Sequence, residues 1–451
     1  MRRALRATRS PSLDSKPVVI VGGGLSGLAA AVELTSHNIP VLLLEQKPKL
    51  GGRAYSFVDA TTGEVIDNGQ HVLIAGYEHT MRFLEKIGTA NLLNIQSRPS
   101  LLFHHPQRGF SEFSLHKLPS PFHLVAGIVT TNLFSVSDKL RLVRAGVGIQ
   151  FPANDPEFDE MTIDEWLNAF GQSAEVKVSF WIPLAISIMN ESITQASAKI
   201  FVQALHRAFL GNWRNSSLAI PRVGLSQLYV DDAVKFINKH GGTVRPNVEV
   251  VGLQHESACV YGVRCKDGSE VPCRAVILAV PHYEIAHLIP TQFSFAPSLA
   301  DVKSTPIVSI HLWFADDFMA HEVVGVVGRS IQWVFNKRKT NLETRTGGHV
   351  SCVISGAGEF VDFTNAELVR IALNDIRSMY PSASALTHSA VIREKRATFS
   401  CTPASERLRP ENRTGIPNMF VAGDWTNTGL PATIEGAILS GVRSATLVLN
   451  A

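Results

Sequence analysis

The chain has 451 residues, a length that predicts about two to four domains. Apolar residues make up 45% and charged residues 18% of the chain, below the roughly 25% typical of soluble domains, so more surface than usual is available for an apolar partner. The 42 basic and 39 acidic residues leave a net charge of +3, which is too even a balance to indicate nucleic-acid binding, and the composition excludes collagen, disordered and disulfide-scaffold proteins.

Residues 1–16 are rich in Arg and Ser and predict a disordered basic tail, with an organelle-targeting signal as the alternative. The five cysteines are scattered and include no C-x-x-C pair. They indicate reduced thiols in a cytosolic protein, with no zinc or other metal site. No uncharged apolar stretch of about eighteen residues occurs, so we expect no transmembrane helix.

The first folded segment predicts a β-α-β unit. Residues 17–21 and 40–45 are unbroken apolar runs typical of buried parallel strands, and residues 28–36 have helical composition. Between them, Gly22-x-Gly24-x-x-Gly27 follows a strand and opens a helix, and Glu45 ends the next strand eighteen residues after Gly27. This pattern is typical of a Rossmann-type dinucleotide site, where glycines admit a pyrophosphate and the acid binds a ribose.

The remaining segments predict a mixture of helices and strands, with a broken, polar pattern over residues 99–121. Predicted helices cover residues 80–88, most of 162–210, 224–242 and 365–380, with a last helix from about Thr433. Predicted strands cover residues 243–253, 259–265, 271–280 and 418–422, and strand-like runs alternate with turns over 302–356.

Two further motifs point to a second part of the same cofactor site. Gly51-Gly52-Arg53 follows the second strand, where glycines and a guanidinium suit a phosphate. Residues 420–424 repeat the order of strand, glycine and acid that ends at Asp424. The small residues of the following helix would let a flat ring lie against its positive end. Taken alone, each motif also fits a surface turn or a closely packed helix.

Together, VVIVGGGLSGLAAAVEL, LLLE, GGRAYSF and VAGDWTNTGLPATIEGAILSGVRSA resemble the FAD-dependent amine oxidase and phytoene desaturase superfamily over residues 17–450. The resemblance implies FAD and an α/β fold similar to glutathione reductase, with an inserted α+β substrate region. It divides the chain into an FAD-binding domain (17–98, 221–290 and 400–451) and a substrate-binding domain (99–220 and 291–399). The cofactor residues assigned by motif and resemblance are Gly22, Gly24, Leu25, Ser26, Gly27, Glu45, Gln46, Gly52, Arg53, Val248, Gly423, Asp424, Thr433 and Ile434.

IDNGQHVLIAGYEHTMRFLEKIG, at residues 66–88, is similar to the signature of hydroxysqualene dehydroxylases, and several later blocks fit that family in order. The resemblance implies that reduced FAD replaces the hydroxyl of hydroxysqualene, a long polyprenyl lipid, with hydrogen. It also implies a prenyl synthase as a neighbouring partner. One departure is Gly224, where the family pattern leads us to expect an acid. The alternatives are a carotenoid or phytoene desaturase, an amine oxidase, or a non-catalytic FAD-binding escort of a prenyl-lipid enzyme.

Because a hydroxyl is a poor leaving group, the reaction needs a proton donor. The candidate catalytic residues are Asp67, His71 and Glu435, with Glu191 as a weaker one. Each also has a structural interpretation, since carboxylates cap turns and histidines satisfy buried backbone groups.

A lipid substrate must enter from lipid. Residues 122–134 contain no Lys, Arg, Asp or Glu, and Lys139, Arg141 and Arg144 follow. We expect this segment to dip into an anionic membrane through Leu124, Ile128 and Phe134, so that a cytoplasmic protein lies on the inner face of the membrane. The alternative is a buried helix that lines the substrate tunnel.

Overall fold

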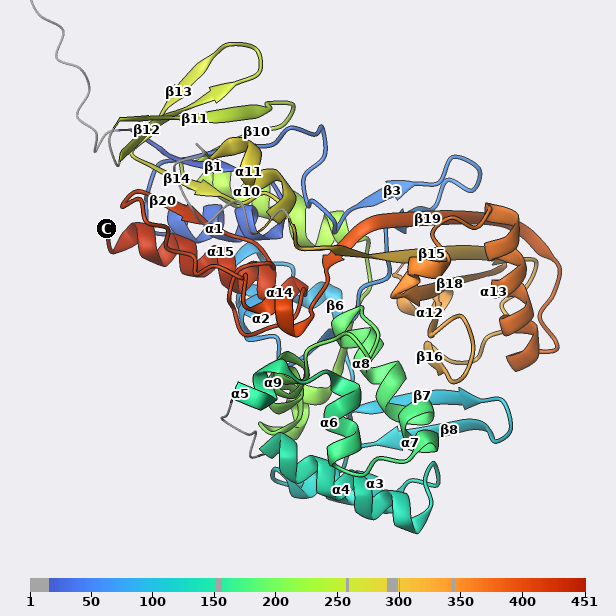
Figure 1. Cartoon of the computed structure of the whole chain (residues 1–451). Coiled ribbons are helices and arrows are strands. Elements are labelled where there is room, and N and C mark those ends of the chain that lie inside the picture. Colours follow the sequence, from blue (N-terminus) through green and yellow to red (C-terminus); the bar gives the residue numbers. More distant parts are fainter. Residues whose placement is uncertain (1–15, 151–155, 257–258, 290–298, 300, 343–344) are drawn as a thin grey trace, which may run out of the picture.

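The computed structural model describes residues 16–150, 156–256, 259–289, 299, 301–342 and 345–451 (Figure 1). Apart from Lys16, the predicted disordered tail lies outside the described residues.

The centre of one half of the molecule is a parallel sheet of five strands. Its middle strand, β1, is fully buried and pairs in register with its two neighbours, for example Val18 with Val41 and with Ala275. Buried strands of this kind need helices on both faces, which explains their unbroken apolar sequences. The order is β10 (Thr243–Arg245), β2 (Val41–Leu44), β1 (Val18–Val21), β14 (Ala275–Leu278) and β20 (Met419–Val421).

Helices from distant parts of the chain pack beside this sheet. The first, α1 (Leu25–Ser36), crosses α15 (Ile434–Leu449) where Gly441 meets Ser26. A Cβ on Gly441 would lie 2.1 Å from the carbonyl oxygen of Ser26, so only glycine allows this approach. The other helices of this half are α2 (Glu78–Ile87), α10 (Asp232–Lys239), α11 (His282–Leu288) and α14 (Pro403–Glu406).

The second half contains a seven-stranded sheet whose neighbouring strands are antiparallel except for the parallel β16–β7 pair. Its buried face packs against α13 (Asn365–Met379), and the short helix α12 (Lys337–Thr340) follows β17 directly. The order is β19 (Leu386–Phe399), β15 (Ser304–Phe314), β18 (Gly348–Ser355), β17 (Trp333–Asn336), β16 (Val323–Val326), β7 (Ser100–His105) and β8 (Gly109–Ser114).

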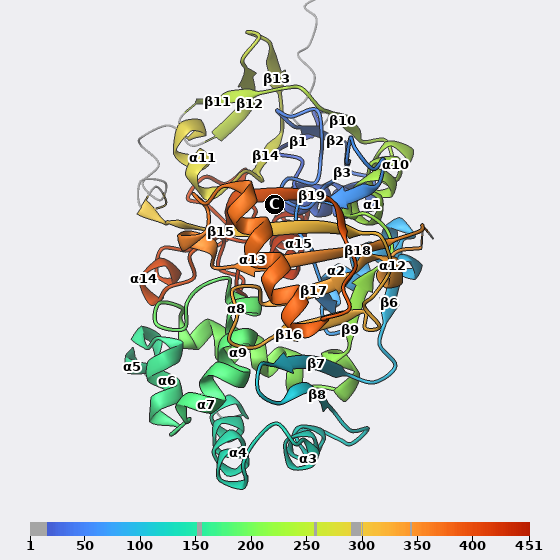
Figure 2. The same ribbon diagram turned by 90° about the vertical axis from the view of Figure 1, so that its right-hand side faces the viewer.

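A helical region completes the second half. In both views α3 and α4 lie together at the end of the molecule opposite the small sheet β11–β13 (Figures 1 and 2). Among the described residues no helix is long and apolar enough to cross a bilayer. The helices are α3 (Phe122–Thr130), α4 (Val136–Gln150), α5 (Pro156–Glu160), α6 (Ile163–Ala169), α7 (Ala174–Val176), α8 (Ile182–Met189) and α9 (Ala198–Phe209).

Three small antiparallel sheets lie between or beside the larger ones. One is the predicted meander, β11 (Val250–Glu256), β12 (Cys259–Cys265) and β13 (Glu270–Pro272). The others are β3 (Ser56–Val58) with β4 (Val65–Asp67), and β9 (Leu218–Pro221) between β5 (Leu73–Ile74) and β6 (Leu93–Ile95). Because β9 begins at Leu218, its sheet spans the predicted domain boundary at residue 221. The domain division itself stays a prediction.

The predicted α/β fold class is confirmed, and so is the opening β-α-β unit. Three local predictions are wrong. Residues 271–280 form two strands in different sheets, β13 in the meander and β14 in the five-stranded sheet. Residues 99–121 contain the β7–β8 hairpin, whose polar and charged side chains conceal the strand pattern. Residues 243–253 form two strands in different sheets, because the chain turns at Asn247, where φ is 61°.

Candidate functional site

The carboxyl ends of the parallel strands meet at one edge of the five-stranded sheet, as they must when strands run the same way. A cavity of about 680 Å³ lies at this edge, within the roughly 300–1,000 Å³ range of cofactor and small-molecule sites. Residues that follow β1, β2, β14 and β20 line one side of the cavity. The seven-stranded sheet lines the opposite side through Ile307, Val353, Glu394 and Thr398.

The cavity brings together all but one of the residues predicted to bind the cofactor. Gly27 is the exception: a Cβ there would lie 2.0 Å from the carbonyl oxygen of Gly22, so this glycine allows the start of α1 to pack closely on the preceding turn. Those that line the cavity are Gly22, Gly24, Leu25, Ser26, Glu45, Gln46, Gly52, Arg53, Val248, Gly423, Asp424, Thr433 and Ile434.

The start of α1 has the features of a phosphate cradle. Gly24 is the N-cap residue and provides no side-chain hydrogen bond, so the first N–H groups of the helix have no cap partner. A Cβ on Gly24 would meet nothing nearer than the Cα of Gly52, at 3.9 Å, so the backbone is open on the side that faces the second glycine motif. The residues therefore fit a dinucleotide pyrophosphate.

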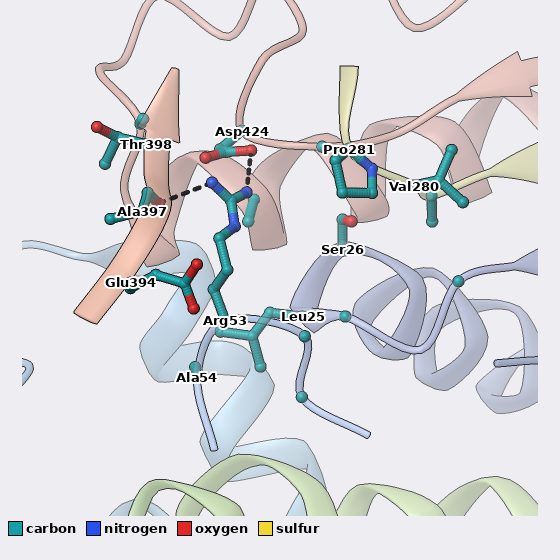
Figure 3. Close-up of a pocket in the computed structure, with 18 of the residues that line it drawn as sticks. Leu25, Ser26, Arg53, Ala54, Val280, Pro281, Glu394, Ala397, Thr398 and Asp424 are labelled. Carbon is teal, nitrogen blue, oxygen red and sulfur yellow. Dashed lines mark hydrogen bonds and ion pairs between the residues drawn. The ribbon is translucent and has the colours of Figure 1, made fainter. Parts of the chain in front are cut away.

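Arg53 connects the two ends of the chain across this cavity. Its guanidinium donates to Asp424 Oδ1 at 2.7 Å and to the carbonyl oxygen of Ala397 at 2.8 Å, and Glu394 lies beside it (Figure 3). Burial opposes the charge of Arg53, but Asp424 raises the pKa of the guanidinium, so it stays a cation. About a third of the Arg53 side chain remains exposed, which leaves room for a phosphate.

Glu45 and Val248 hold one wall of the cavity. The Glu45 carboxylate accepts hydrogen bonds from the backbone N–H groups of Gly23 and Lys47, at 2.7 and 2.8 Å. Val248 donates its N–H to the carbonyl oxygen of Glu45 at 2.9 Å. These bonds fix both residues at the cavity, with carboxylate lone pairs remaining for a ribose.

Of the four candidate proton donors, only His71 lines the cavity. Its Nδ1 lies 2.8 Å from the carbonyl oxygen of Gly69, and because a carbonyl only accepts, Nδ1 carries the hydrogen. In the neutral ring, Nε2 therefore holds a lone pair. Burial lowers the pKa of His71, although Gly69 and Asp67 oppose this shift, so the ring is mainly neutral at pH 7.

The three carboxylates do not line the cavity and make structural hydrogen bonds. Asp67 accepts from Ser56 Oγ at 2.7 Å and from the N–H of Leu225 at 2.9 Å. Glu435 accepts from the N–H groups of His79 and Thr80 at the start of α2, at 3.0 and 2.9 Å. Glu191 accepts from two hydroxyl groups, those of Thr305 and Ser400.

The departure at Gly224 has a local explanation. A Cβ at this position would lie 2.6 Å from Ser56 Oγ. Ser56 in turn donates to Asp67 and exchanges hydrogen bonds with Ser226. Gly224 therefore leaves room for Ser56, which is hydrogen-bonded to Asp67. Gly224 itself does not line the cavity.

Several cavity residues were missed by sequence reasoning. Val280 and Pro281 follow β14, so their place after a predicted buried strand was a usable signal. Glu394 and Thr398 belong to β19, whose charged residues gave no strand pattern. Gln70 lies within the 66–88 block but was assigned no role, although it lines the cavity too.

The cysteines show no sign of redox or metal chemistry. All five are free, and burial raises the pKa of Cys273 to about 12, so this thiol stays protonated. Within the described parts of the chain, no group of three or more His, Cys, Asp or Glu side chains is placed to hold a metal ion.

Comparison with known proteins identifies similar chains over the full length. The family described as flavin containing amine oxidoreductase matches residues 25–449. The hydroxysqualene dehydroxylase of Rhodopseudomonas palustris is 31% identical to the chain, over 97% of the chain and 99% of the relative. That of Sinorhizobium fredii is 30% identical, over 96% of the chain and 99% of the relative. A 15-cis-phytoene desaturase of Synechococcus elongatus is 21% identical over 96% of the chain and 95% of its own length. An oxidoreductase from Methanosarcina mazei has the same fold, with a TM-score of 0.73, 17% identity, and coverage of 95% of this chain and 99% of that one.

Replacing Arg53 tests the cofactor site. We expect Arg53→Met to weaken FAD binding by about 10- to 100-fold, since a charge-assisted hydrogen bond contributes roughly 1.5–3 kcal/mol. Equilibrium dialysis of the holoenzyme measures FAD release. Arg82→Met, at an exposed position on α2, is the control and should bind FAD normally. Unchanged FAD affinity in both Arg53→Met and the double variant Arg53→Met/Asp424→Asn would contradict the assignment.

Proposed function

The chain belongs to the flavin-containing amine oxidoreductase family, and we propose that this FAD-dependent oxidoreductase replaces the hydroxyl of hydroxysqualene with hydrogen to give squalene. The full-length similarity to hydroxysqualene dehydroxylases supports this substrate. The observation that carries the proposal is the position of His71 and Gln70: both line the cavity that the predicted cofactor residues line. Polar groups beside a cofactor suit a substrate with one polar atom.

The reaction balances as the loss of one carbon–oxygen bond and the gain of one carbon–hydrogen bond. When bound, reduced FAD supplies the hydride equivalent. The hydroxyl oxygen needs a proton so that it departs as water. The residues predicted to hold FAD are the motif glycines, Glu45, Arg53, Val248, Asp424 and the start of α15.

We assign the proton transfer to His71. The Gly69 carbonyl fixes the ring through Nδ1, so Nε2 is the atom that gains and gives the proton. The three carboxylates lie outside the cavity lining, so we assign them structural roles. Asp67 holds the backbone at Leu225, Glu435 holds the start of α2, and Glu191 holds Thr305 of β15.

The surface of α3 and α4 supports contact with a membrane. Four side chains face outward with exposed fractions of 58–77%: Phe122 at 63%, Val129 at 58%, Val136 at 77% and Leu140 at 69%. We call these four residues the apolar patch. Isolated exposed apolar residues are common, but a group on adjacent helices indicates an apolar partner. Of the predicted basic residues, Arg141 and Arg144 are exposed on α4 and Lys139 is half-buried. Lys117 is exposed between β8 and α3, and these cations would attract anionic lipid headgroups.

The three side chains predicted to contact lipid are less exposed than the apolar patch. Leu124 and Ile128 are half-buried, and Phe134 is buried against Phe180. On α3 the helical period turns Leu124 and Ile128 toward the core, away from the exposed Phe122 and Val129, whereas Phe134 lies in the segment between α3 and α4. We infer that the apolar patch rests on the inner face of the membrane, where a prenyl synthase would be the neighbouring partner.

The central experiment separates this function from its alternatives. The holoenzyme is reduced anaerobically, hydroxysqualene is added, and flavin absorbance and squalene are measured. We expect the flavin to reoxidise and one squalene to form per flavin. A phytoene desaturase would instead bleach when the oxidised protein meets phytoene, and an FAD-binding escort would respond to neither lipid.

The pH profile tests His71. Only the protonated ring donates, and its pKa lies below the ordinary value of 6.5, so kcat/KM should rise as the pH falls below about 6.5. His71→Gln should lower the rate at pH 6 by about 100-fold and flatten the profile. His37→Gln, at an exposed position, is the control. An unchanged acid limb in His71→Gln would refute the assignment.

Liposome co-sedimentation tests the apolar patch. The variant Phe122→Asp/Leu140→Asp should reduce binding to vesicles with 30% anionic lipid by at least tenfold, because each apolar side chain removed from lipid costs roughly 1.5–3 kcal/mol. Val58→Asp/Phe363→Asp makes the same change at exposed apolar residues elsewhere and should bind normally. Equal binding by both variants would reject the membrane contact.

A further inference from the structure

Beside the cavity lies a buried lysine for which the proposed mechanism has no use. Lys337 is the first residue of α12 and only 3% exposed. Its Nζ donates to Gln70 Oε1 at 2.9 Å and lies 3.8 Å from Asp67 Oδ2. Burying an ammonium group is costly unless it is paired and hydrogen-bonded. Burial lowers the pKa of Lys337, and the Asp67 carboxylate opposes that shift.

The start of α12 holds this lysine firmly. Asn336 is the N-cap of the helix and accepts from the N–H of Arg338 at 2.9 Å. The Asn336 amide also donates to Asp317 Oδ1 and to the carbonyl oxygen of Met319, at 2.9 and 2.7 Å. The backbone that carries Lys337 is therefore fixed from both sides of the cap.

The lysine determines which end of the Gln70 amide faces the cavity. An ammonium group has donors and no acceptor, so only Oε1 of the amide can face Lys337. The planar amide then directs its NH₂ group away from Lys337. Gln70 lines the cavity, and among the described residues its Nε2 has no protein hydrogen-bond partner. Without the lysine, the amide could equally present its oxygen.

We propose that Gln70 donates a hydrogen bond to the hydroxyl oxygen of an alcohol substrate, and that Lys337 is the positioning residue that fixes its amide. The inference rests on the proposed function and deepens it. The next residue, His71, holds a lone pair on Nε2 when neutral. With His71 neutral, Gln70 and His71 provide one donor and one acceptor to the bound alcohol, the complement of an O–H group. When the ring takes up a proton, Nε2 becomes the second donor, which the proposed reaction requires.

This pairing distinguishes the alcohol from the hydrocarbon product. Squalene has no oxygen, so in its presence the donor and the acceptor lose their partner. Sites built to bind a hydroxyl strongly disfavour analogues that lack it. The same penalty favours release of the product and rejection of any hydrocarbon polyene.

Equilibrium binding to the oxidised holoenzyme tests the inference without turnover. Hydroxysqualene and squalene are titrated separately in detergent micelles, and the change in flavin absorbance gives each affinity. We expect the natural protein to prefer the alcohol by at least tenfold. Gln70→Leu and Lys337→Met should bring the ratio close to one by weakening the alcohol alone. Lys339→Met, at an exposed position on the same helix, should keep the natural ratio.

A second variant guards against misfolding. Lys337→Met leaves Asp67 as an unpaired buried charge, so Lys337→Met/Asp67→Asn removes both charges together and should show the same loss of preference.

Preference for the alcohol retained in Gln70→Leu would overturn the inference. An equal loss of affinity for both lipids would also overturn it, because that result indicates a change in cavity shape. An altered flavin spectrum of Gln70→Leu without lipid would also overturn it, by placing the amide on the cofactor. If the natural protein converts hydroxysqualene while Gln70→Leu keeps its preference, the inference alone fails. If the natural protein neither converts nor prefers the alcohol, both the inference and the proposed function fail.

Discussion

The site depends on one contact between the two ends of the chain, in which Arg53 and Asp424 pair across 371 residues of sequence. The pair forms only when β20 lies beside β14 and α15 crosses α1. The close approach of the helices at Gly441 and the buried Asp424 carboxylate thus enforce one geometry. Each half of the cavity is incomplete without the other. The cofactor site therefore exists only in the assembled fold, and no single local motif forms it.

Much of this arrangement could be predicted from sequence because its elements are locally encoded. Unbroken apolar runs identify β1 and β2, and between them Gly22 and Gly27 stand where a Cβ would clash with nearby backbone. The parallel direction of the strands then places Glu45 and Asp424 at the same sheet edge. That reasoning needs only the order of elements, which explains why most of the predicted cofactor residues line one cavity.

The rest could not be predicted because it depends on partners that are distant in sequence. Asp67, Glu191 and Glu435 are chemically competent acids, and only their hydrogen-bond partners show what occupies them. Lys337 is one of many lysines, and its burial beside Gln70 comes from the packing of α12 against a loop 267 residues earlier. On α3, composition identified an apolar helix but not which face of it packs inward.

The location of α15 has a consequence for biosynthesis. This helix contributes Ile434 to the cavity, anchors the start of α2 through Glu435, and crosses α1 at Gly441. In chain order it follows every other segment that lines the cavity, so it leaves the ribosome after them. A nascent chain that has already made β1, β2 and β14 still lacks one wall of the coenzyme pocket, so loading must wait until translation has passed α15.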